Sequence, residues 1–131
     1  MKLISLVLGL WLAFVAQAAM AGSVGFQQLT IKNGDDTPLV AGVWYPTDAS
    51  ASPQALEGFE QTVAPDGPVI RGRYLPLIVM SHGNGGWYGG HYDTALALAR
   101  AGFVVAAIDH TGDTYKDQSR AIRMEIGRAH V

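Results

Sequence analysis

Two continuous apolar runs constrain the fold of this chain more than any other feature. Residues 75–80 and 103–108 carry no charged side chain, which is typical of strands buried on both faces of a parallel sheet. Between them lie a glycine-rich loop over 83–90 and an apolar stripe with helical spacing, formed by Tyr92, Ala95, Leu96 and Ala99. A strand, a helix and a second parallel strand make a right-handed crossover. The sequence therefore predicts an α/β fold whose parallel sheet is covered on both sides.

An antiparallel hairpin is predicted ahead of this unit, at one edge of the sheet. Residues 24–32 alternate unevenly between apolar and polar side chains, and residues 38–45 form a second, mostly apolar strand. The turn residues Asn33-Gly34-Asp35-Asp36 separate them. In the first strand the apolar residues change face near Gln27-Gln28. We therefore expect a β-bulge at that point.

The segment over 46–74 has a different character. It contains four prolines and several small residues, and it shows no sustained period. We expect a long surface loop there, with one helical turn around 54–59.

The composition excludes several classes of function. The 131 residues include 9 Lys and Arg against 11 Asp and Glu, without a basic run, so we expect no nucleic-acid partner. The length suits one domain of modest size. The chain has no cysteine, which excludes a thiol nucleophile, a disulfide, a zinc knuckle and an iron–sulfur site.

The N-terminal residues have the pattern of an export signal. Lys2 precedes an apolar stretch over 3–15, and Ala19-Met20-Ala21 supplies a small-x-small cleavage site. The alternative is a membrane anchor, but the apolar stretch is shorter than the roughly 20 residues that span a bilayer. We expect residues 1–21 to be a cleaved signal peptide, with no stable membrane span afterwards. A periplasmic or secreted location follows, and a lipoprotein would need a cysteine after the cut.

The last six residues have a different explanation. Residues 126–131 can be written as the codons ATC GGA AGA GCA CAC GTC, which is a common sequencing-adapter sequence. The alternative is a coincidence over six codons. We expect 126–131 to be an artefact, and 22–125 to be the N-terminal part of a truncated domain.

The loop after the first apolar run carries the most specific motif, Ser81-His82-Gly83-Asn84-Gly85-Gly86. In an open parallel sheet, ligands bind at the carboxyl ends of the strands, where this loop and residues 109–114 should both lie. A tetrahedral acyl intermediate needs backbone N–H donors from a loop that can approach it closely. Three glycines remove the Cβ atoms that would hinder such an approach.

Residues 75–86 and 95–110 resemble the α/β-hydrolase fold. More narrowly, they resemble the exported dienelactone-hydrolase-like group related to platelet-activating-factor acetylhydrolases. Val43-Trp44-Tyr45-Pro46 resembles the opening of that group, and the resemblance extends over about 24–117. It implies the N-terminal part of an α/β-hydrolase sheet, a serine enzyme that hydrolyses a small-molecule ester or lactone, and no cofactor or metal.

The resemblance also implies roles for individual residues. His82-Gly83 match the His-Gly that opens the oxyanion loop of the family, and Asn84 takes the position whose backbone N–H binds the oxyanion. His82 is expected to orient the loop. The second donor of the family follows the serine of a Gly-x-Ser-x-Gly elbow. The sequence contains no such elbow, and Ser119 has no flanking glycines. We therefore expect the 131 residues to be inactive by themselves.

Other residues near the loop have alternative roles. Trp87, Tyr88 and Tyr92 could line an acyl pocket or simply pack on the loop. Ser81 lies outside a nucleophile elbow, so we do not expect it to be the nucleophile. Asp109, His110 and Asp113 could mimic a metal site, but ester hydrolysis on this fold needs no metal.

Two other classes of function are left open. Gly83-Asn84-Gly85 after a strand and Asp109 at the end of the next strand are features of a dinucleotide-binding unit. However, Tyr88 stands where the third glycine of that motif belongs. A non-catalytic exported binding protein on the same fold is the other possibility, because a fold does not determine a function.

Overall fold

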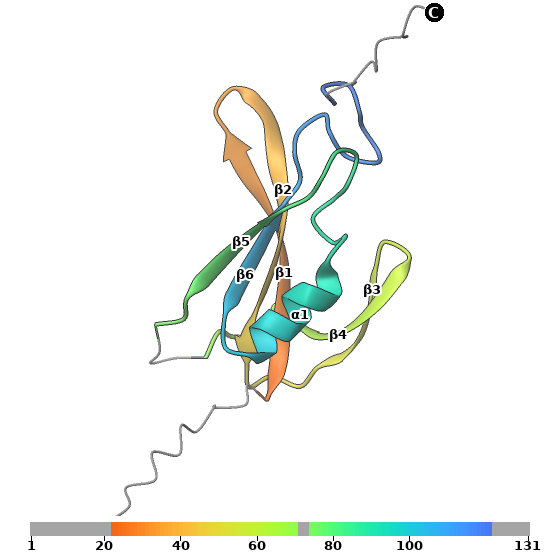
Figure 1. Cartoon of the computed structure of the whole chain (residues 1–131). Helices are drawn as coiled ribbons and strands as arrows, with labels where there is room; N and C mark the ends of the chain where they lie inside the picture. Colours follow the sequence, from red (N-terminus) through yellow and green to blue (C-terminus); the bar gives the residue numbers. More distant parts are fainter. Residues whose placement is uncertain (1–21, 71–73, 122–131) are drawn as a thin grey trace, which may run out of the picture.

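The computed structural model describes residues 22–70 and 74–121. The expected signal peptide and the expected adapter-encoded tail lie outside the described residues. The elements along the chain are β1 (Ser23–Asn33), β2 (Asp36–Thr47), β3 (Ser52–Leu56), β4 (Phe59–Pro65), β5 (Leu77–Ser81), α1 (Tyr92–Arg100) and β6 (Val104–Ile108). In this part of the chain the strands form one mixed sheet in the order β3-β4-β1-β2-β6-β5, with α1 packed on one face (Figure 1).

The predicted strand–helix–strand unit is present. β5 and β6 pair in parallel, with Leu77 opposite Val104 and Ser81 opposite Ile108. The helix between them buries three of the four residues of the predicted stripe, Ala95, Leu96 and Ala99. The fold class predicted from the two apolar runs is therefore confirmed.

The end of α1 follows from a glycine. Gly102 has φ +101°, in the left-handed region that favours glycine. Its N–H donates to Ala99 O, and the N–H of Phe103 donates to Leu98 O. These two bonds form a Schellman motif, which satisfies the last carbonyls of the helix and turns the chain into β6.

The N-terminal hairpin is also confirmed. β1 and β2 pair antiparallel around a turn at Gly34-Asp35. The predicted bulge at Gln27-Gln28 is wrong, because the register runs unbroken there and shifts only between Ile31 and Asn33. The pattern was misleading because Gln28 lies on the same face as Phe26, where its side-chain oxygen accepts a hydrogen bond from the Tyr88 hydroxyl.

The predicted long loop with a helical turn is wrong. The segment folds instead into a second hairpin, β3–β4, and β4 pairs in parallel with β1 at Gly25 and Phe26. Its turn is formed by Glu57 with φ 44° and Gly58 with φ 93°. Positive φ at both central residues is the requirement of a type I′ turn, which matches the twist of paired strands.

The core lies between α1 and one face of the sheet. Trp44, Val63, Val105 and Ala99 are fully or almost fully buried there. Burial of such apolar side chains is the dominant favourable contribution to folding. The packing of α1 on this face therefore holds β5 and β6, and with them the loops that follow these two strands.

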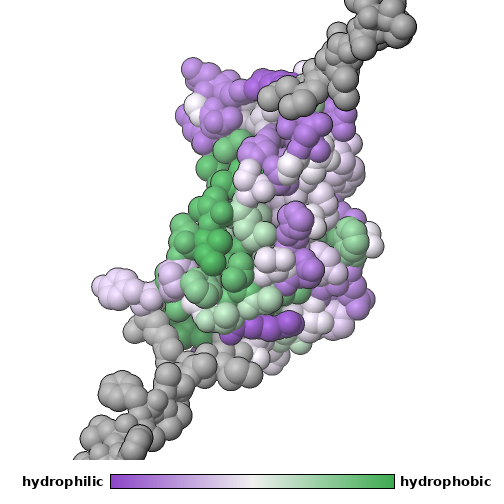
Figure 2. Space-filling model, in the orientation of Figure 1, coloured by the Kyte–Doolittle hydropathy of each residue, from purple (hydrophilic) through white to green (hydrophobic). Residues whose placement is uncertain are grey.

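The opposite face of the sheet is open over β5 and over the turn end of β1. Leu77 and Val79 are each 61% exposed, and Leu29 and Ile31 are each 40% exposed. Figure 2 shows the resulting hydrophobic band along the side where Figure 1 places β5. The prediction of a sheet covered on both sides is wrong for the described residues, because their one helix covers a single face and β5 is an edge strand.

None of the helices within 22–70 and 74–121 has the length and apolar character needed to cross a membrane.

Candidate functional site

The loops that follow β5 and β6 meet at one edge of the sheet. The two strands are parallel neighbours, so their carboxyl ends lie side by side. The first loop runs from His82 to His91 and the second begins at Asp109 (Figure 1). This edge is where α/β sheets bind their ligands.

A tight turn shapes the first loop. The N–H of Gly86 donates to Gly83 O over 3.0 Å, which closes a β-turn around Asn84 and Gly85. Gly85 has φ +67°, as the third residue of a type II turn requires. A Cβ on Gly86 would lie 2.9 Å from the His82 Cβ and 3.0 Å from Gly83 O. The two glycines therefore permit a turn that larger residues would strain.

The second loop holds this turn in place. The Asp113 carboxylate accepts a hydrogen bond of 2.7 Å from Gly85 N–H, and the Asp109 carboxylate accepts one from Tyr88 N–H. In return, the N–H of Tyr115 donates to Gly86 O over 3.1 Å. Hydrogen bonds to a charged acceptor are among the stronger ones in proteins. The loop is therefore fixed at three points before any ligand arrives.

Asn84 is left with an available amide. The residue is exposed, and no acceptor among the described residues takes up its N–H. A backbone donor on a rigid turn at the carboxyl edge of the sheet can bind an anion without reorganising first. This geometry suits a developing oxyanion.

His82 is held by main-chain groups at both ring nitrogens. Nδ1 lies 2.8 Å from Gly83 O, and Nε2 lies 3.1 Å from the N–H of His110. A carbonyl can only accept and an N–H can only donate, so the bonds require the neutral ring with its proton on Nδ1. In this arrangement the lone pair on Nε2 is already occupied, and the ring joins the two loops.

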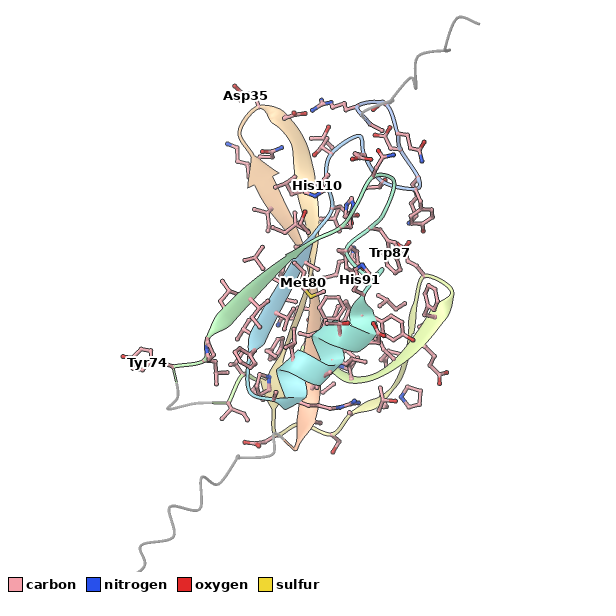
Figure 3. The ribbon with its side chains drawn as sticks, in the orientation of Figure 1. Asp35, Tyr74, Met80, Trp87, His91 and His110 are labelled. Carbon is pink, nitrogen blue, oxygen red and sulfur yellow. The ribbon has the colours of Figure 1, made fainter. Side chains whose placement is uncertain are left out.

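Sequence reasoning missed a contact between Ser81 and His110. The serine Oγ lies 2.7 Å from Nε2 of the histidine, and the His82 and His110 rings lie 4.5 Å apart (His110 is labelled in Figure 3). The sequence did place Ser81 and His110 at the ends of two neighbouring parallel strands. The register then brings them together, because Ser81 pairs with Ile108, two residues before His110. Such a pair could act as nucleophile and base. Within the described residues, however, no carboxylate bonds to the other ring nitrogen of His110, as a triad would require.

The acidic residues of the second loop face backbone amides. Among residues 22–70 and 74–121 there is no group of three or more His, Asp or Glu side chains that could hold a metal ion. Asp109 and Asp113 instead accept the hydrogen bonds described above. The sequence pattern of these residues gave no indication that they brace the glycine loop.

Trp87 and Tyr88 occupy different environments. Tyr88 is 4% exposed and packs against Trp44, and its hydroxyl donates to Gln28. Burial, with the nearby charges of Glu57 and Asp109, raises the pKa of Tyr88 to about 12. Trp87 is half-buried and lies at the surface of the glycine loop (Figure 3). Tyr88 thus supports the loop from the core, while Trp87 remains accessible.

Comparisons with known proteins agree with this fold. A solved structure of a ferulic acid esterase from Streptomyces cinnamoneus superposes with a TM-score of 0.64 at 22% sequence identity. The match covers 76% of this chain and 37% of the esterase chain, so the 131 residues span well under half of that protein. No match was found among the curated proteins.

The family comparison is more specific. Residues 23–126 match the family model described as platelet-activating factor acetylhydrolase, isoform II. The match includes both hairpins, the glycine loop, α1 and the loop after β6. The chain therefore belongs to the platelet-activating factor acetylhydrolase, isoform II, family and has an α/β-hydrolase-like fold.

Proposed function

We propose that this chain supplies the oxyanion-hole loop of an exported serine hydrolase that acts on small carboxylic esters or lactones. The observation that carries the proposal is the backbone N–H of the exposed Asn84, which binds no acceptor among the described residues and lies in a loop that Asp109 and Asp113 brace. Membership of an acetylhydrolase family supports ester chemistry. The structural neighbour, which is a ferulic acid esterase and much longer than this chain, supports the same fold.

The nucleophile, acid and base belong, on this proposal, to polypeptide outside the 131 residues. A serine Oγ would attack the ester carbonyl carbon, and the carbonyl electrons would move onto its oxygen. The N–H of Asn84 would then donate to that oxyanion, together with the N–H that follows the nucleophile. Collapse of the intermediate expels the alcohol, which takes the proton from the histidine base, and water later releases the acid.

Within this scheme His82 and Gly83 have supporting roles. His82 links the two loops through its ring nitrogens, and Gly83 accepts the hydrogen bond that closes the turn. Export through the predicted signal peptide at 1–21 would place the enzyme in the periplasm or outside the cell.

The Ser81–His110 pair supports a second candidate, in which Ser81 itself is the nucleophile. Active-site labelling separates the two. The complete protein is treated with a fluorophosphonate, and the labelled peptide is identified by mass spectrometry. We expect the label on the serine of a Gly-x-Ser-x-Gly sequence outside the 131 residues, and equal labelling of Ser81→Ala.

Two results would contradict the proposal. A label on Ser81 that Ser81→Ala abolishes would favour the second candidate. A protein that takes up no label and hydrolyses neither 4-nitrophenyl acetate nor a simple lactone would instead be a non-catalytic member of the fold.

A further inference from the structure

Four aromatic side chains from three separate segments meet beside the glycine loop. Phe59, at the start of β4, stacks on Trp87 with ring centroids 6.5 Å apart and planes at 19°. The Phe59 ring also contacts Tyr92, at 5.6 Å, and Tyr115 contacts Trp87 edge-on, at 6.1 Å. We call Phe59, Trp87, Tyr92 and Tyr115 the aromatic cluster.

The tip of the β3–β4 hairpin is tied to the loop after β6. Glu57 accepts hydrogen bonds from the Tyr115 hydroxyl and from Lys116 Nζ, the latter at 2.7 Å. These donors hold the pKa of the Glu57 carboxyl below its usual value. Lys116 also lies 5.4 Å from the centre of the Tyr115 ring. The hairpin therefore brings Phe59 to the site, and the Glu57–Lys116 ion pair adds no net charge to its rim.

The cluster keeps bare ring surface beside the glycine loop. Phe59 is 52% exposed and Tyr115 is 50% exposed, although both contact other rings. Trp87 directly follows Gly86, and Tyr115 N–H donates to Gly86 O, so both are fixed to the turn that carries Asn84. Single exposed apolar residues are ordinary, whereas adjoining ones at a site mark a binding surface.

We infer that the aromatic cluster is a subsite for an aromatic ring of the ester substrate. This inference rests on the proposed function, and it adds the class of ester. Ring faces and edges favour offset or edge-to-face contact with another ring over contact with a saturated group. Because the Glu57–Lys116 ion pair adds no net charge, the rim favours a neutral ring.

The test compares matched esters on the complete protein. Benzyl acetate and cyclohexylmethyl acetate differ in the ring on the alcohol side. Methyl phenylacetate and methyl cyclohexylacetate differ in the ring on the acid side. The aromatic preference is the ratio of kcat/KM within each pair. We expect Phe59→Leu and Tyr115→Leu to lower this preference about 3- to 10-fold in one pair, which also identifies the side of the ester that the cluster binds.

Two variants serve as controls. Phe59→Tyr keeps a ring at the hairpin tip and should retain the preference. Tyr74→Leu removes a fully exposed ring that lies far from Trp87 (Figure 3), and it should change the preference by less than about twofold. Circular dichroism melting of each variant verifies that it is folded.

Failure of this inference differs from failure of the proposed function. A protein that hydrolyses these esters with a preference unchanged in both leucine variants overturns the subsite and leaves the proposed function standing. A protein that hydrolyses none of the four esters contradicts the proposed function. In that case an NMR titration with benzyl alcohol and cyclohexylmethanol tests the subsite. Binding of benzyl alcohol that depends on Phe59 would support the subsite. Equal binding of the two alcohols, or no binding, would overturn it.

Discussion

Replacing Asn84 with proline in the complete protein is expected to lower kcat for ester hydrolysis about 100- to 1,000-fold, with KM nearly unchanged. Proline has no N–H, so the variant removes the donor together with the asparagine side chain. Asn84 is the second residue of the turn from Gly83 to Gly86, a position that favours proline. The loss is confined to kcat because the oxyanion exists only after attack on the carbonyl.

Asn84→Ala is the matched control for this experiment. It removes the asparagine side chain and keeps the backbone N–H, so we expect kcat to stay within about threefold of the original value. Steady-state kinetics with 4-nitrophenyl acetate measure both variants. Equal losses in the proline and alanine variants would assign the effect to the side chain, and full activity of Asn84→Pro would show that the amide takes no part.

The largest effect on stability is expected at Trp44. Its side chain is 0% exposed and lies between the rings of Phe26 and Tyr88, at 4.9 Å and 6.3 Å. Its indole N–H donates to the side-chain oxygen of Gln61 over 2.8 Å. Trp44→Ala should therefore lower the free energy of unfolding by about 3–5 kcal/mol, through the cavity and the orphaned acceptor.

Urea titration of the complete protein, followed by circular dichroism, measures this loss. Trp44→Phe keeps most of the buried volume, so we expect it to cost less than the alanine variant. Tyr74→Ala truncates a fully exposed ring and should stay within about 0.5 kcal/mol of the parent. A loss below about 1 kcal/mol for Trp44→Ala would contradict the placement of Trp44 at the centre of the core.

The parts of the fold that could be predicted are those with a clear period. The apolar runs that became β5 and β6, and the stripe on α1, report burial directly in the sequence. The β1–β2 hairpin was likewise evident from its turn residues, Asn33 to Asp36. In each of these cases the local pattern and the tertiary environment favour the same structure.

The errors arose where tertiary contacts override the local pattern. Gln28 is polar, yet it lies on the core-side face of β1 because the Tyr88 hydroxyl is there to pair with it. The β3–β4 hairpin contains prolines and was expected to be a loop, but Glu57 adopts a positive φ that its residue type rarely accepts. Neither feature can be recognised before the partner strands are in place.

In the candidate site, too, some features could be predicted from the sequence and others could not. The glycines at 83, 85 and 86 marked the loop in the sequence as one that a ligand can approach closely, a feature that a dinucleotide-binding unit shares. The roles of Asp109 and Asp113 were not readable, since a carboxylate that binds a backbone amide looks in sequence like any loop acid. Phe59 was missed because it reaches the site from a hairpin that was not predicted.

A crystal structure of the complete protein after reaction with a fluorophosphonate tests the central claim most directly. The phosphonyl group on the nucleophile mimics the tetrahedral intermediate, with an oxygen in the position of the oxyanion. We predict that this oxygen lies about 2.7–3.1 Å from the backbone nitrogen of Asn84. A phosphonyl oxygen more than about 4 Å from that nitrogen, bound instead by amides from another loop, would contradict the account.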